Sequence, residues 1–183
     1  MDKDWVRAIT KAKWLVIALM VVLSCFSACT DSVQLPRAPL HFPFEVQRAG
    51  NKIETELQVL ERREYSFSLR FGFKENDEVD RARVKKLVGD HMIDKYGKLV
   101  EPGIPIPLRL RINVVDVAGE RTIFEKEISE QGLWAWGGVD FAKLIESMIL
   151  KPGHYRISVE TLKDIPELIG IPVTFNISFG HSK

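Results

Sequence analysis

The sequence predicts a mostly β domain, an antiparallel β-sandwich of about seven strands with two short inserted helices. Two observations carry this prediction. Apolar and polar residues alternate with a period of two in several separate stretches, which places the apolar side chains on one face of each strand. Turn-forming Gly, Pro and Asn residues separate these stretches. Strands with one apolar and one polar face suit two sheets that pack face to face.

Length, composition and charge are those of an ordinary globular domain. The chain has 183 residues, which is enough for one domain with a sizeable core. Hydrophobic residues make up 45% and charged residues 28% of the chain. The formal net charge is +1 and no basic patch stands out, so we expect no nucleic-acid partner.

Residues 1–28 have the layout of a signal peptide rather than of a folded segment. Basic residues at the start precede an unbroken apolar run from Trp14 to Ser24, and the small residues Ser27 and Ala28 follow. The apolar run is shorter than the roughly 20 residues that a membrane-spanning helix needs. We therefore predict a cleaved signal, with an uncleaved N-terminal anchor as the alternative.

The two cysteines lie at the end of this segment, and none follow. The ending Phe26-Ser-Ala-Cys29, before three polar residues, resembles a bacterial lipobox, whose cysteine carries diacylglycerol and further acyl chains such as palmitate. This resemblance implies that Cys29 is the lipid attachment site, with Cys25 as the alternative. Two or three acyl chains hold a protein durably on a membrane.

The resemblance also implies a location. We expect the protein to be lipid-anchored in the cell envelope and to face the periplasm. The outer membrane is favoured over the inner membrane, because Asp31 is not adjacent to Cys29, where the familiar inner-membrane retention signal lies.

After the lipid site, residues 29–40 are predicted to form a tether, because they contain Pro36 and Pro39 and lack periodicity. The sandwich domain is then expected over residues 41–183. Alternation predicts strands over 42–47, 53–59, 65–73, 104–114, 124–128, 155–160 and 173–179. Arg109 and Arg111 fall on the polar face of one strand, so we expect them in solvent.

The first predicted helix spans about residues 77–88, inside an insertion that reaches Gly103. Asn76 or Asp77 would cap it, Glu78 and Asp80 suit its first turn, and two lysines lie near its end. The acidic residues here lack the loop Gly and distal Glu of a calcium-binding EF-hand, so helix-start electrostatics explains them better.

The second predicted helix spans residues 141–149. Phe141, Leu144, Ile145 and Met148 recur at helical spacing. Proline and glycine follow directly, which favours the end of a helix there.

A distinctive stretch, Leu150-Lys-Pro-Gly-His-Tyr155, follows the second predicted helix. Pro152 would end that helix, and Gly153 would supply a backbone angle that other residues avoid. The stretch resembles the tyrosine corner of Greek-key sandwiches, in which the ring packs inward and its hydroxyl bonds to nearby backbone. We therefore expect Leu150, Pro152, Gly153 and Tyr155 to be structural. An immunoglobulin-like arrangement is the first choice of architecture and a closed barrel the second.

The sequence contains no familiar catalytic motif. The sequence has no Gly-x-Ser-x-Gly elbow, no His-Glu-x-x-His and no phosphate-binding Gly-rich loop. The histidines His41, His91, His154 and His181 are scattered, and no nucleophile or metal ligand is spaced to serve any of them. We therefore expect no enzyme, no catalytic residue, no metal and no cofactor.

Trp134 and Trp136 are the candidate partner-binding residues. They flank Ala135 in a Gly-rich stretch, and Trp is enriched at binding hot spots because one side chain desolvates a large area. Alternatively, both rings cover an open end of the sandwich as part of its core. If both lie on a short strand, their spacing predicts that they share a face.

Taken together, Cys29 and a sandwich with the Leu150–Tyr155 corner resemble small bacterial envelope lipoproteins of an uncharacterised family. Such proteins are similar in build to periplasmic immunity lipoproteins. The resemblance implies a binding protein whose partner is a toxin delivered to the envelope. The alternative is a structural or assembly lipoprotein that binds a component of an envelope or secretion machine.

Overall fold

The structure, a computed structural model, describes residues 34–90, 92, 94–98 and 100–180. The chain from residue 35 onward forms one compact unit. The candidate lipid sites Cys25 and Cys29, the predicted signal peptide, and His91 and His181 lie outside the described residues. Among the described residues, no helix is both long and apolar enough to cross a membrane.

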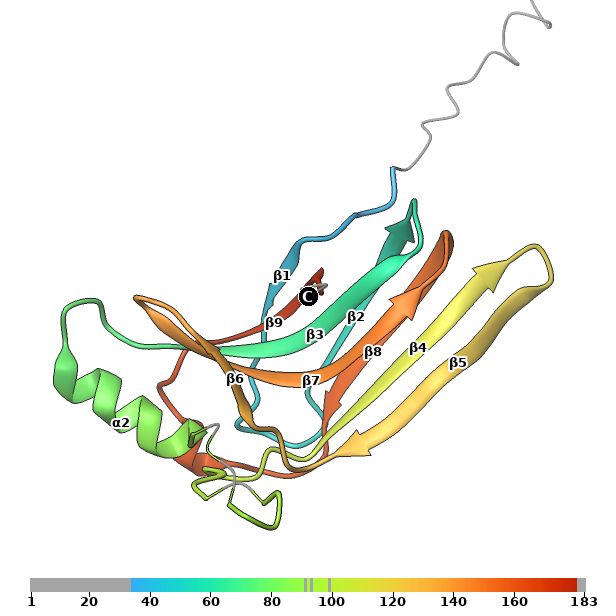
Figure 1. Cartoon of the computed structure of the whole chain (residues 1–183). Coiled ribbons are helices and arrows are strands. Elements are labelled where there is room, and N and C mark those ends of the chain that lie inside the picture. Colours follow the sequence, from blue (N-terminus) through green and yellow to red (C-terminus); the bar gives the residue numbers. More distant parts are fainter. Residues whose placement is uncertain (1–33, 91, 93, 99, 181–183) are drawn as a thin grey trace, which may run out of the picture. The chain divides into compact units, whose positions relative to one another are not determined.

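The domain is a two-layer antiparallel β-sandwich, as the alternation predicts (Figure 1). One sheet has five strands, in the order β1 (Leu40–Pro43), β9 (Val173–Phe179), β3 (Arg63–Gly72), β7 (Asp140–Leu150) and β6 (Leu133–Trp136). The other sheet has four strands, in the order β2 (Lys52–Val59), β8 (Gly153–Thr161), β4 (Leu108–Asp116) and β5 (Gly119–Ile128).

The strand order corrects the predicted immunoglobulin-like arrangement. With β6 set aside, the remaining strands numbered along the chain run 1-8-3-6 in one sheet and 2-7-4-5 in the other. This is the order of a jelly roll. In the immunoglobulin fold, strands that follow one another along the chain pair as hairpins within a sheet. Here the chain crosses between the sheets at each step from β1 to β4. The described residues also form nine strands rather than about seven.

The prediction of two inserted helices is wrong, because the described residues contain one α-helix, α2 (Glu78–Val88), and one 3-10 turn, η1 (Pro166–Leu168). The second predicted helix is strand β7. Phe67 of β3 lies opposite Glu146, but the next residue, Ser68, lies opposite Leu144, so Ile145 is the extra residue of a β-bulge. The bulge shifts the alternation of β7 by one residue, and the resulting apolar spacing imitates a helix.

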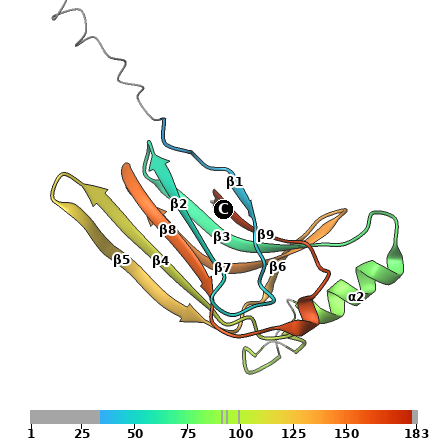
Figure 2. The ribbon, with the colours of Figure 1, turned by 180° about the vertical axis from the view of Figure 1, so that it is seen from behind.

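The core lies between the two sheets and extends beneath α2. Its fully buried side chains come from strands of both layers: Phe67, Leu69, Phe71, Phe175 and Ile177 from one sheet, and Leu57, Leu110, Ile112 and Ile157 from the other. Burying each of these side chains stabilises the fold by about 1.5–3 kcal/mol. At one end of the sandwich, Val84 and Val88 of α2 and Leu168 of η1 join the same cluster. The chain enters the domain at the end opposite α2 (Figures 1 and 2).

The domain begins before its first strand. The carbonyl oxygen of Pro36 accepts a hydrogen bond of 2.8 Å from the backbone N–H of Gln58. Residues 36–39 therefore contact the sandwich, and β1 starts at Leu40.

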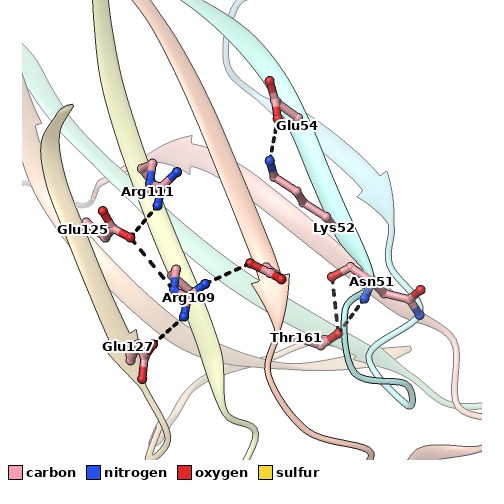
Figure 3. A network of polar contacts seen from close by, with 9 residues as sticks. Asn51, Lys52, Glu54, Arg109, Arg111, Glu125, Glu127 and Thr161 are labelled. Atoms are coloured by element: carbon pink, nitrogen blue, oxygen red, sulfur yellow. Dashed lines mark hydrogen bonds and ion pairs between the residues drawn. The ribbon is translucent and has the colours of Figure 1, made fainter. Parts of the chain in front are cut away.

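The outward face of the four-stranded sheet carries a network of ion pairs (Figure 3). Arg109 Nη2 lies 2.7 Å from Glu127 Oε1, and its Nη1 lies 3.3 Å from Glu160 Oε2. Arg111 Nη2 lies 2.7 Å from Glu125 Oε1, and the hydrogen bond to Arg111 lowers the pKa of the Glu125 carboxyl. Arg109 and Arg111 are partly exposed, so this is the solvated face that the sequence predicts. Single pairs of this kind contribute little to stability.

Candidate binding site

Trp134 and Trp136 both lie on β6, but a second bulge separates them. Leu133 pairs with Lys143 and Ala135 with Ala142, which are adjacent on β7, so the register shifts at Trp134. Trp136 lies opposite Phe141 and lines a cavity with α2. Trp134 lines a different cavity on the outward face of the five-stranded sheet. The expectation that both rings share one face is therefore wrong.

The cavity beside Trp136 lies between β6 and α2 and has a volume of about 350 Å³. Its apolar floor is formed by Leu133 and Phe141, which are 5% and 4% exposed, and the Trp136 side chain beside them is 59% exposed. The remaining lining residues come from the insertion: Glu78, Arg81, Ala82, Lys85 and Asp90. The structure thus places Trp136 of β6 beside the insertion that contains α2. We call this hollow the α2 pocket.

Ion pairs line the helical side of the α2 pocket. Lys85 Nζ lies 3.1 Å from Asp90 Oδ2, and Arg81 Nη1 lies 3.6 Å from Glu78 Oε1. Because each cation has an acidic partner, the pocket offers no net charge. Its chemical character is set by the aromatic rings.

The start of α2 is fixed by its own acidic residues. Asp77 caps the helix, since its Oδ1 accepts a hydrogen bond of 2.9 Å from the backbone N–H of Asp80. Asp80 Oδ2 accepts a bond of 2.8 Å from the Lys74 backbone N–H, and Oδ1 accepts one of 2.9 Å from Arg83 Nε. These two donors, with Lys74 the stronger, lower the pKa of the Asp80 carboxyl. The acidic cluster is therefore a helix start, as the sequence predicts.

The two ends of the loop that follows α2 are clamped together. The Asp90 backbone N–H donates to the Glu101 carbonyl at 2.6 Å, and the Ile104 N–H donates to the Leu87 carbonyl at 2.8 Å. We call this closed base of the loop the neck. Lys143 reinforces the neck, because its Nζ donates a hydrogen bond of 3.0 Å to the Pro102 carbonyl. Its side chain is almost fully buried, and burial lowers its pKa to about 8. The sequence does not predict this clamp. Lys143 is a single charged residue in an otherwise apolar stretch, and no residue near it in the sequence identifies the Pro102 carbonyl as its partner.

The tyrosine corner joins the two sheets. Strand β7 ends at Leu150 in one sheet, and β8 begins at Gly153 in the other. The Tyr155 ring is buried, and its hydroxyl donates a bond of 2.8 Å to the Lys151 carbonyl, which is the bond expected of this motif. The unusual backbone angle expected at Gly153 is wrong, because Gly153 has no positive φ and is the first residue of an ordinary strand.

The described histidines lie on different sheets. His41 of β1 bonds through Nδ1 to Asn176 Oδ1 at 2.8 Å, and His154 Nε2 of β8 lies 3.4 Å from Glu56 Oε2. Within the described ranges, no three or more His, Cys, Asp or Glu side chains are grouped so that they could hold a metal ion.

The family described as a domain of unknown function (DUF5625) matches residues 41–179, so the chain belongs to this family. A search of curated proteins gives no match.

Among solved structures, the chain is similar to a protein from Sulfurospirillum deleyianum, with 21% identity and a TM-score of 0.65. The match covers 79% of this chain and 98% of that one, and it shows a shared fold.

Two further likenesses are weaker. A family 35 carbohydrate binding module from an environmental isolate has 11% identity and a TM-score of 0.31, over 85% of this chain and 92% of that one. A cycloisomaltooligosaccharide glucanotransferase from Paenibacillus sp. has 13% identity and a TM-score of 0.32, over 75% of this chain and 14% of that one. At these TM-scores, neither likeness establishes a shared fold.

Proposed function

We propose that this member of the DUF5625 family is a lipid-anchored envelope protein that faces the periplasm and binds another protein. Its partner in this proposal is a toxin delivered to the envelope, which it neutralises by binding. The lipobox-like ending at Cys29 supports the anchor. The α2 pocket is the single observation that carries the binding role.

The α2 pocket has the features of a binding hot spot. An exposed Trp beside an apolar floor can desolvate a large area when a partner covers it. The volume of about 350 Å³ lies at the small end of the range for ligand pockets, which is roughly 300–1,000 Å³. The pocket therefore suits one or two apolar side chains that a partner inserts beside Trp136.

The rigidity of the surrounding elements supports binding by a preformed surface. The Asp77 cap fixes the start of α2, and the clamped neck of the following loop fixes its end. A surface that is already ordered loses little conformational entropy when a partner docks, which favours affinity. Inhibition by binding needs this kind of surface and no catalytic group.

Crosslinking in cells tests the proposal directly. A photo-crosslinking amino acid is placed at position 136 in the full chain, in cells that contain the toxin. Position 117, where Val117 is fully exposed on the β4–β5 hairpin, serves as the matched control. We expect an adduct with the toxin at position 136 and none at position 117. An adduct with an envelope or secretion component would instead favour the assembly role, and equal labelling at both positions would refute binding at the α2 pocket.

A survival assay tests the neutralising role. We expect that deletion of the gene lowers survival against a toxin-armed competitor, and that Trp136→Ala fails to restore it. Trp134→Ala is the matched control and should restore survival, because its ring lies outside the α2 pocket. Unchanged survival of the deletion strain against every such competitor would count against the immunity role.

Membrane fractionation tests the anchor separately. Cys29→Ala should move the protein from the membrane to the soluble fraction, whereas Cys25→Ala should leave it in the membrane. Release by Cys25→Ala alone would identify Cys25 as the lipidated residue.

A further inference from the structure

The cavity that contains Trp134 is a second candidate site, separate from the α2 pocket. It has a volume of about 440 Å³ and lies on the outward face of the five-stranded sheet. All five strands contribute to it, through His41, Arg70, Trp134, Ala142 and Asn176. A second cavity of about 360 Å³ adjoins it, because both are lined by His41, Arg70 and Asn176. Because the two cavities share these residues, we call them together the groove.

Two polar side chains that line this groove are almost fully buried. Ser68 and Asn176 are each 2% exposed, although they lie on the outward face of the sheet. The bond from His41 Nδ1 to Asn176 Oδ1, 2.8 Å long, holds the amide in one orientation. Within the described part of the chain this is the one hydrogen bond of the Asn176 side chain, so its Nδ2 donors are available to a ligand. A few fixed polar groups in a cavity of this size are typical of a small-molecule site.

A paired guanidinium and carboxylate form one side of the groove. Arg70 Nε lies 3.0 Å from Asp140 Oδ2, and Arg70 Nη2 lies 3.1 Å from Asp140 Oδ1. The hydrogen bond from Nη2 and the close approach of Nε hold the two groups together as an ion pair. The pairing also cancels their charges, so the groove does not favour an anion or a cation. Its donors and acceptors suit a neutral ligand rich in hydroxyl groups.

Trp134 adds an aromatic surface at the rim, where it is 37% exposed. The face of an aromatic ring carries partial negative charge and packs against C–H groups, while polar neighbours bind the edges of the same ligand. A pyranose ring presents C–H groups on its face and hydroxyl groups at its rim. We infer that the groove binds a neutral oligosaccharide, with one sugar ring on Trp134 and others along Arg70 and Asn176.

Binding of defined tetrasaccharides tests this inference. The full chain is purified in a polyoxyethylene detergent, which carries no sugar head group. It is then titrated with N-acetylchitotetraose, cellotetraose and maltotetraose, and with anionic tetragalacturonate, by calorimetry and tryptophan fluorescence. We expect saturable binding of at least one neutral tetrasaccharide, weakened by roughly tenfold or more in Trp134→Ala. Trp136→Ala is the matched control and should bind within about twofold of the unmodified chain.

Three results would overturn the inference. The first is that no neutral tetrasaccharide binds saturably at millimolar concentration. The second is that only tetragalacturonate binds. The third is that Trp134→Ala and Trp136→Ala weaken tetrasaccharide binding equally. Circular dichroism of each variant keeps a folding defect from being mistaken for a lost contact. The toxin crosslink at position 136 is independent of this groove, so either proposal can fail while the other stands.

Discussion

The backbones of Gly89 and Gly103 lie directly against each other at the neck of the loop that follows α2. A Cβ atom on Gly89 would overlap the backbone nitrogen of Gly103, and a Cβ on Gly103 would overlap the Val88 backbone. Both glycines also have positive φ, +84° and +69°. The backbone approach that closes the loop therefore requires glycine at both positions.

Replacing Gly103 by alanine should destabilise the domain by about 2–4 kcal/mol, because the backbone strain and the overlap act together. Gly97→Ala is the matched control: Gly97 has a φ of +79° but open space around its Cβ, so this change should cost only about 1 kcal/mol. Urea unfolding of the three proteins measures both values. Equal losses for the two variants would mean that the neck can open without penalty.

Replacing Tyr155 by phenylalanine should lower the free energy of unfolding by about 1 kcal/mol, because a buried hydroxyl loses its bond to the Lys151 carbonyl. Tyr96→Phe, at a ring that is 75% exposed, should leave the free energy unchanged. Thermal or urea unfolding distinguishes the two. No effect of Tyr155→Phe would indicate that the corner does not depend on its hydroxyl.

The buried Lys143 should make the domain more stable at alkaline pH. Its pKa falls from 10.5 to about 8 in the folded state, so between these values the unfolded chain binds more protons than the folded one. The free energy of unfolding should therefore rise by about 3 kcal/mol from pH 8 to pH 10.5 and stay low below pH 8.

The Lys143→Met variant should lack this rise, whereas Lys163→Met, at an exposed lysine, should retain it. Urea unfolding at several pH values measures the slope. Parallel curves for the unmodified chain and Lys143→Met would contradict the prediction.

Replacing Asp77 by alanine should destabilise the domain by about 1 kcal/mol, because the Asp80 N–H loses its capping acceptor. Asp77→Asn keeps an acceptor and should lose at most a few tenths of a kcal/mol. Hydrogen exchange of the amides in the first turn of α2 reports the local effect. If these amides exchange no faster in Asp77→Ala, packing alone holds the helix start.

Long, uninterrupted alternation made most strands predictable. The apolar faces of β3 and β9 follow the period of two from end to end, and so does β8 after the corner. The start of α2 was predictable too, because its capping interactions are local in sequence. Each of these features depends on residues only a few positions apart.

Features that depend on distant pairings were not predictable. The bulge at Ile145 gives β7 a helical spacing of apolar residues, and only its pairing with β3 reveals the strand. The bulge at Trp134 likewise separates the two Trp rings. In the groove, Arg70 and Asn176 read as ordinary solvent-facing residues of two strands. Nothing local indicates that these strands are neighbours, or that their polar faces meet His41.

Strand β5 ends the four-stranded sheet, so one row of its backbone N–H and C=O groups faces outward. Charged side chains follow one another along this strand, among them Glu120, Arg121, Glu125, Lys126 and Glu127. A strand from a neighbouring copy could pair there only by stripping water from several of these charges. The charges therefore protect the β5 edge against pairing with a strand of a neighbouring copy.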